Sequence, residues 1–165
     1  MEPREKVLMV LESLRIEYKL YDHRAIPTIE AAAEIWKDID SSHCKNLFFR
    51  NHKGDKHYLV ILNYLQQLDI HDLEKRLKQG KISFASDHRL EKFLGLMAGS
   101  VSPYGLINDE NNHVHVFIDE SLKNSEKISF HPNVNTSTLV VQFSDFMRYL
   151  EWTGNSYEFI KMYEY

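Results

Sequence analysis

The 165-residue chain is predicted to fold as a single α+β domain, spanning residues 1–165, with a mixed, largely antiparallel sheet flanked by helices. Its composition, with 43% hydrophobic and 12% aromatic residues, is that of a globular protein. Its length suits one domain with a substantial core, and no repeat or linker divides it. Segments with helical spacing and segments with strand character are mixed without strict alternation, which favours the α+β class.

The first half of the chain predicts three helices and four strands. Apolar residues at helical spacing, behind a proline or a capping side chain, predict helices that begin at Pro3, Thr28 and Asp69 and end near Ser13, Trp36 and Gly80. Alternating or continuous apolar runs predict strands over residues 17–21, 44–50, 57–62 and 82–84. Residues 51–56 have hairpin-turn chemistry and join two of these strands.

The second half predicts two more helices and a series of strands. The helices are expected from Ser86 to near Gly95 and from Ser144 through Leu150. Strands are expected over residues 104–107, 113–118, 128–130 and 138–141, with an edge strand over 157–163. Residues 109–112 supply the turn between the first two of these strands.

Charge and cysteine content argue against several classes of protein. The net charge of −4 disfavours wrapping of a long nucleic acid, although it leaves room for binding a single nucleic-acid end. The single cysteine, Cys44, excludes an internal disulfide and suits a reducing compartment, so we expect a cytoplasmic protein. No apolar run approaches the roughly 20 residues of a membrane span, and residues 1–6 lack a signal-peptide layout. No membrane partner is therefore expected.

A central loop over residues 94–106 combines glycines and a proline within an otherwise apolar run. Gly99 permits positive φ and close approach of a ligand, because it has no Cβ. Pro103 fixes its own φ and biases Ser102 toward extended geometry. Such a loop offers N–H groups to a carbonyl or carboxylate oxygen. The alternative is an ordinary connection between two elements.

Three polar residues beside apolar strands are candidates for ligand binding. Lys45 begins a strand, so its ammonium either reaches solvent or faces an anion. The neighbouring Asn46 either binds a ligand or simply ends the strand. His131 follows another strand and either donates a hydrogen bond to a phosphate or carbonyl or is a surface-loop histidine.

The sequence gives little support for a metal site, a side-chain nucleophile or a bound cofactor. His113 and His115 would share one face of a strand, but no third or fourth ligand stands out, so no metal site is expected. Cys44 is expected to be a small buried residue, since no positioned base is evident for a nucleophile. No phosphate-binding loop, dinucleotide fingerprint or nucleophile elbow occurs, and no cofactor is expected.

Three stretches, taken together and in order, resemble the signature segments of one family. They are Lys45-Asn46-Leu47-Phe48-Phe49, Gly99-Ser100-Val101-Ser102-Pro103 and His131-Pro132-Asn133-Val134-Asn135-Thr136. The chain resembles, over nearly its whole length, the YbaK/ProX family of free-standing aminoacyl-tRNA editing domains. These are relatives of the insertion domain of bacterial prolyl-tRNA synthetase. The likeness is greatest to the ProX branch (PrdX, ProXp-ala), which removes alanine wrongly attached to proline tRNA.

The resemblance implies a role for each matching position. Lys45 would grip the terminal adenosine or its phosphate, Gly99 would hold the aminoacyl group through backbone atoms, and His131 would position the tRNA end. Further substrate-binding residues are then expected in the same stretches and in the segment that bounds the side-chain pocket: Asn46, Ser100, Val101, Ser102, Pro103, Ile26, Pro27 and Thr28. The implied partner is the acceptor end of tRNA(Pro) carrying a mischarged amino acid, with prolyl-tRNA synthetase as a protein partner.

The implied reaction is hydrolysis of mischarged Ala-tRNA(Pro) in trans. A synthetase cannot strongly reject a smaller side chain by binding alone, because a missing methylene is worth only about 1–3 kcal/mol. A second site that hydrolyses smaller products solves this problem. We expect water to attack the ester, backbone N–H groups to stabilise the oxyanion, and the substrate 2′-hydroxyl or amine to assist. The alternatives are a Cys-tRNA(Pro) deacylase of the same fold and a binding module that hydrolyses nothing.

Overall fold

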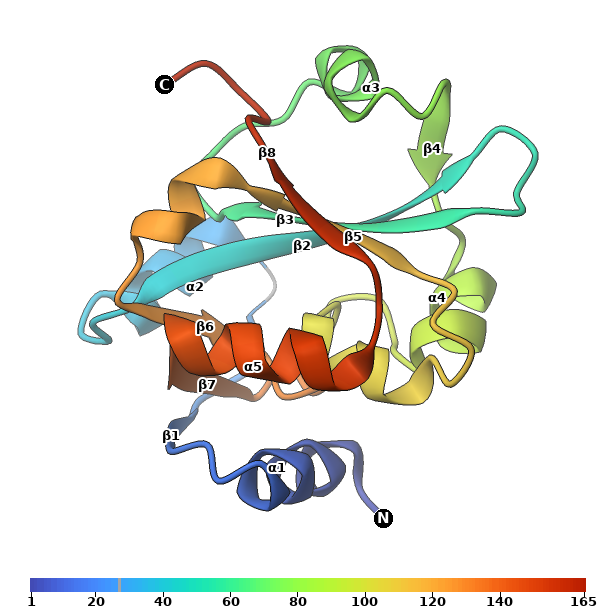
Figure 1. Ribbon diagram of the computed structural model, residues 1–165. Helices are drawn as coiled ribbons and strands as arrows, with labels where there is room; N and C mark the ends of the chain where they lie inside the picture. Colours follow the sequence, from blue (N-terminus) through green and yellow to red (C-terminus); the bar gives the residue numbers. More distant parts are fainter. Residues whose placement is uncertain (27) are drawn as a thin grey trace.

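A mixed eight-stranded sheet organises the computed structural model, which describes residues 1–26 and 28–165 (Figure 1). Its strands are β1 (Tyr18–Asp22), β2 (Ser42–Asn51), β3 (His57–Asn63), β4 (Ile82–Phe84), β5 (His115–Asp119), β6 (Lys127–Phe130), β7 (Ser137–Gln142) and β8 (Tyr157–Ile160). The order is β1-β7-β6-β2-β3-β5-β8, and β4 also pairs with β2. Within the described residues, four pairings are antiparallel and three parallel. The predicted α+β class with a mixed, largely antiparallel sheet is confirmed.

The helices begin largely where capping residues predicted them. They are α1 (Pro3–Ser13), α2 (Ile29–Trp36), α3 (Ile70–Leu77), α4 (Asp87–Leu94) and α5 (Phe143–Thr153), with two 3₁₀ helices, η1 (Pro103–Asn108) and η2 (Glu120–Asn124). The side chains of Thr28, Asp69 and Ser86 each accept a hydrogen bond from a first-turn N–H, as expected of N-caps.

Several predicted elements differ from the structure. The last helix, expected to open at Ser144, begins at Phe143 without a side-chain cap, and the strand expected from residue 113 begins at His115. The strand expected over residues 104–107 is instead part of η1, because Ser102 Oγ accepts from the Tyr104 N–H and Pro103 is preset for a first helical turn. Helix α3 ends at Leu77 rather than at Gly80, since Lys78 itself adopts the left-handed conformation with φ of 57°. The last strand, expected over residues 157–163, stops at Ile160.

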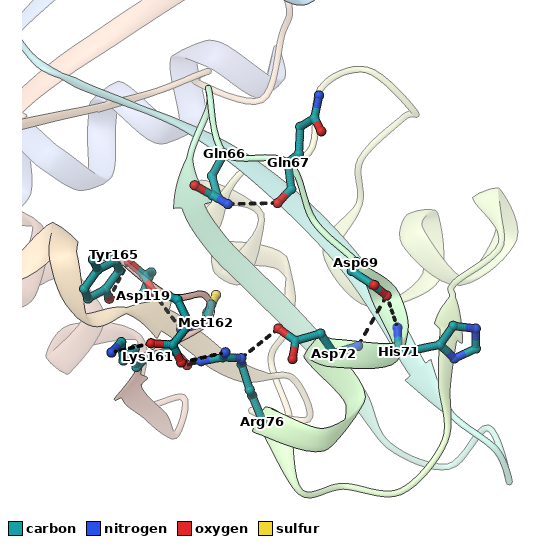
Figure 2. A network of polar contacts seen from close by, with 11 residues as sticks. Gln66, Gln67, Asp69, His71, Asp72, Arg76, Asp119, Lys161, Met162 and Tyr165 are labelled. Atoms are coloured by element: carbon teal, nitrogen blue, oxygen red, sulfur yellow. Dashed lines mark hydrogen bonds and ion pairs between the residues drawn. The ribbon is translucent and has the colours of Figure 1, made fainter.

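The segment that follows β8 is held by polar contacts rather than by sheet pairing. Asp119 is fully buried and accepts hydrogen bonds from the Met162 N–H and the Tyr165 hydroxyl, each at 2.9 Å (Figure 2). Arg76 of α3 donates to Asp72 in its own helix and to Glu164 in the tail. These contacts hold the C-terminal segment against α3 and β5, beside the part of the sheet formed by β3, β5 and β8.

Strand β2 is the element that joins the two halves of the sheet, and it changes partners along its length. Its first residues, Ser42 and His43, pair in parallel with β6, and residues 49–51 pair with β4. Both partners lie on one edge, because β3 pairs with residues 44–50 along the other. On that first edge residues 44–47 pair with no strand in the described part of the chain. Extending the parallel register by two residues brings His131 level with Lys45.

Candidate functional site

A cavity of about 290 Å³ opens beside the unpaired stretch of β2. This volume is near the roughly 300 Å³ lower limit of small-molecule sites. Five parts of the chain wall it: the connection from β1 together with α2, strand β2, the residue after β3, the central loop, and the residue after β6. The lining residues are Ile26, Thr28, Ala32, Trp36, Cys44, Lys45, Asn46, Tyr64, Gly99, Val101 and His131.

Most of the residues singled out in the sequence come together in this cavity. Lys45, Asn46, Gly99, Val101, His131, Ile26 and Thr28 all line it, although they come from segments far apart in the chain. Pro27 lies outside the described residues.

The other three loop residues predicted to bind substrate support the loop from within the fold. Ser100 is buried and Ser102 is fully buried. Ser102 caps η1, and the carbonyl of Pro103 accepts the Tyr149 hydroxyl at 2.8 Å. Their direct contact with a substrate stays a prediction.

The Lys45 ammonium is not used by the fold. Within the described residues, Lys45 Nζ makes no ion pair or hydrogen bond. The backbone of Lys45 and of its neighbours in β2 pairs regularly with β3. Partial burial lowers the pKa of the Lys45 ammonium. A cation at the mouth of a small cavity, without a protein counter-ion, suits an anionic ligand group.

Asn46 carries an orphaned acceptor. Its Oδ1 is buried and has no hydrogen-bond partner among the described residues. Leaving such an acceptor unpaired costs about 1–3 kcal/mol, so a native structure retains it for a reason. Because Asn46 lines the cavity, a rotation of its side chain would bring this acceptor to a ligand N–H or O–H.

His131 is held as a neutral hydrogen-bond acceptor. Its Nδ1 lies 2.9 Å from the carbonyl oxygen of Ser137, so Nδ1 carries the proton and donates it. Burial lowers the pKa of His131, which keeps the ring neutral. The other nitrogen, Nε2, then has a free lone pair. The expected donation to a phosphate or carbonyl is therefore replaced by acceptance from a ligand N–H, O–H or water.

The central loop presents free backbone donors. The Ser100 N–H closes a turn on the Met97 carbonyl, whereas the N–H groups of Gly99 and Val101 have no acceptor within the part of the chain described. Gly99 has φ of +89°, where a side chain is strained. A Cβ there would meet only Asn135 Nδ2, at 3.8 Å, so backbone conformation rather than crowding by protein atoms requires the glycine.

The apolar wall contains residues that the sequence did not single out as ligand-binding. Trp36 was expected only as part of a helix stripe, and Ala32 lies on the same face. The Trp36 ring stacks on His43 at 4.6 Å and meets the edge of Tyr64 at 5.1 Å. No spacing rule distinguishes such a wall residue from a core residue. Cys44 is buried as expected, and burial raises the pKa of its thiol, so a reactive thiolate is disfavoured.

The two neighbouring histidines of the sequence do not form a site together. His113 precedes β5 and its Nε2 lies 2.8 Å from His57 Nδ1, whereas His115 contacts Ser156 and Glu158. Across residues 1–26 and 28–165, no group of three or more His, Cys, Asp or Glu side chains could hold a metal ion. Among the same residues no helix has the length and apolar character needed to cross a bilayer.

Comparison with known proteins gives matches along most of the chain. Residues 23–149 match the family model described as an aminoacyl-tRNA editing domain. The chain is 37% identical over 164 residues to the prolyl-tRNA editing protein ProX of Acetoanaerobium sticklandii, covering 98% of this chain and 99% of that protein. It is 27% identical to the mouse prolyl-tRNA synthetase associated domain-containing protein 1, covering 93% of each.

A solved structure, named as a proposed trans-editing enzyme for prolyl-tRNA synthetase, superposes with a TM-score of 0.68 at 19% identity. The superposition covers 98% of each chain, and at that identity it speaks for the fold alone.

Proposed function

Because the chain belongs to the family of aminoacyl-tRNA editing domains, which act as aminoacyl-tRNA deacylases, we propose that its substrate is tRNA(Pro) mischarged with alanine. It would act in the cytoplasm, as one domain spanning residues 1–165, with prolyl-tRNA synthetase as its partner. One observation carries the proposal. A small cavity with an apolar wall joins the unpaired Lys45 ammonium to the free N–H groups of Gly99 and Val101. These groups suit an aminoacyl ester on a terminal adenosine whose 5′ phosphodiester is anionic.

The ester is already an activated acyl group, so orientation and charge stabilisation are the main tasks of the protein. In the proposed complex Lys45 binds the terminal adenosine or its phosphate. The Gly99 and Val101 N–H groups donate to the oxyanion that forms when water attacks the ester carbonyl. Water is the proposed nucleophile, since the buried Cys44 thiol remains protonated.

Two acceptors would orient the polar groups of the substrate. His131 Nε2 is available to accept a hydrogen bond from the α-amine, the 2′-hydroxyl or the attacking water, and a rotation of the Asn46 side chain would bring its buried Oδ1 into the cavity as a second acceptor. Neither needs to remove a proton outright, because the substrate 2′-hydroxyl or amine assists the water in this proposal. Replacing the 2′-hydroxyl of the terminal adenosine by hydrogen tests this part, and an unchanged rate would remove the 2′-hydroxyl from the mechanism.

Alanine is the favoured side chain because the cavity is small and its wall is apolar. Ile26, Ala32 and Trp36 give the cavity an apolar wall that suits a methyl group, and the proposal requires this wall to exclude the larger proline ring. The same wall also suits the polarisable thiol of cysteine, so a Cys-tRNA(Pro) deacylase is the second candidate. In that reaction the substrate thiol itself would attack the ester carbonyl and release the 3′-hydroxyl of the tRNA, and water would then open the resulting thiolactone to cysteine.

The deciding experiment measures loss of the ester from tRNA(Pro) charged with alanine, cysteine, serine or proline. The proposal expects fastest hydrolysis of the alanyl ester and protection of the prolyl ester. Faster hydrolysis of the cysteinyl ester would favour the second candidate. Slower loss of every ester than in buffer alone would instead identify a binding module and overturn the assignment as a deacylase.

A further inference from the structure

We propose that Thr138 is a positioning residue that, through Trp36, sets the discrimination of the site by side-chain size. The inference rests on the proposed function, since it concerns the wall of the same cavity. Thr138 lies in β7, is 1% exposed and does not line the cavity. Its hydroxyl oxygen is 2.9 Å from Trp36 Nε1 and 2.8 Å from His23 Nε2. One buried hydroxyl thus contacts two segments that form the wall.

The direction of each hydrogen bond follows from the chemistry of the partners. The indole N–H of Trp36 is only a donor, so Thr138 Oγ1 accepts it. His23 Nδ1 lies 2.7 Å from the carbonyl oxygen of Arg24, which can only accept, so Nδ1 donates; in the tautomer with its proton on Nδ1, Nε2 is an acceptor. The Thr138 hydroxyl therefore donates to His23. Only a side chain that accepts and donates at one oxygen satisfies both neighbours.

The two segments that the Thr138 hydroxyl contacts both form part of the cavity wall. Trp36 lines it directly, and His23 begins the connection that leads to the lining residues Ile26 and Thr28. The aromatic contacts of the Trp36 ring are with His43, Tyr64 and His131, at 4.6, 5.1 and 6.2 Å between ring centroids. Stacked rings tolerate lateral displacement, whereas a hydrogen bond prefers a narrow range of distance and angle. The bond to Thr138 is therefore the contact that fixes how far the indole extends along the wall.

The test compares hydrolysis of alanyl- and prolyl-tRNA(Pro) by Thr138→Val and Thr138→Ser. Valine keeps the shape of threonine but can neither accept nor donate, so the alanyl-to-prolyl ratio of kcat/KM should fall roughly two- to tenfold, the range that one hydrogen bond supplies. Serine keeps the hydroxyl and should retain the ratio. Thr153→Val is the matched control, because it removes a threonine hydroxyl that bonds only within and just beyond α5.

A spectroscopic measurement separates positioning from loss of fold. The chain has two tryptophans, so Trp152→Phe leaves Trp36 as the only one. In that background Thr138→Val should increase quenching of Trp36 fluorescence by acrylamide, while Thr138→Ser should not. If Thr138→Val does not fold, Thr138→Cys provides the same test, because a thiol is only a weak donor and acceptor.

An unchanged alanyl-to-prolyl ratio in a folded Thr138→Val protein, with the parental enzyme active, overturns the inference. So does a ratio lowered equally by Thr138→Ser, because the hydroxyl would then not be the cause. If the parental protein hydrolyses neither ester, the proposed function fails instead, and the fluorescence measurement still reports whether Thr138 holds Trp36.

Discussion

Replacing Lys45 by alanine should abolish most of the activity while leaving the fold intact. The ammonium has no protein partner among the described residues, so its removal breaks no ion pair or hydrogen bond of the folded chain. The free energy of unfolding should therefore change by only about 1 kcal/mol, the packing contribution of the partly buried aliphatic stem. The lost contact to the substrate is a charge-assisted hydrogen bond, worth about 1.5–3 kcal/mol. That corresponds to a loss of roughly 10- to 150-fold in kcat/KM.

The assay is deacylation of alanyl-tRNA(Pro), measured beside thermal unfolding of the same proteins. Lys45→Arg should recover part of the rate, because it restores the charge but not the compact shape of an ammonium. Lys53→Ala, in the exposed hairpin after β2, is the matched control and should behave like the parent. Parental kcat/KM in Lys45→Ala would refute the assignment, and a large loss of stability would show that the lysine serves the fold.

Three further outcomes are expected. Gly99→Ala should lower the rate of deacylation, because it strains a backbone with φ of +89°. Gly80→Ala is the control: Gly80 has φ of +77° and open space at its Cβ, so the substitution should lower the free energy of unfolding by a similar amount and leave the rate unchanged. Burial lowers the pKa of His57 to about 4, helped by the nearby charge of Arg89. The ring of His57 titrates near 6.5 in the unfolded chain, so the unfolded state binds a proton first as the pH falls. The free energy of unfolding should therefore decrease by up to about 3 kcal/mol between pH 6.5 and pH 4, as measured by denaturant unfolding. A His57→Phe protein should lack this pH dependence. The lowered pKa of His131 should prevent this residue from causing any fall of kcat/KM above pH 6.5, and a fall near pH 7 that His131→Asn removes would contradict its role as a neutral acceptor.

Much of the fold follows from local signals in the sequence. Thr28, Asp69 and Ser86 were identified as caps because a short polar side chain before an apolar periodic run has few other uses. Residues 104–107 were misread as a strand because apolar side chains are compatible with either periodicity over so short a run. The parallel pairing of β8 with β5 joins distant parts of the chain, and no local pattern encodes it.

The site divides in the same way. Lys45, Gly99 and His131 were found because their residue types are unusual beside apolar strands and because their stretches resemble a known family. Trp36 and Tyr64 were missed, since an aromatic residue in a cavity wall has the same local surroundings in sequence as one in the core. Their roles depend on where α2 and the end of β3 meet, which only tertiary structure determines.

In the proposed site, one part of the fold supplies the groups for hydrolysis and another part supplies the selectivity for the side chain. Strand register creates the opening, and the loop backbone at Gly99 and Val101 supplies the donors. The walls that measure the side chain come from α2 and the segment before it. On the proposed function, exchange of side chains on α2 should redirect the enzyme from one amino acid to another without changing the groups that stabilise the oxyanion. A designer who wants a deacylase for a different mischarged residue should begin with α2 and keep Thr138 of β7, whose hydroxyl accepts the Trp36 N–H.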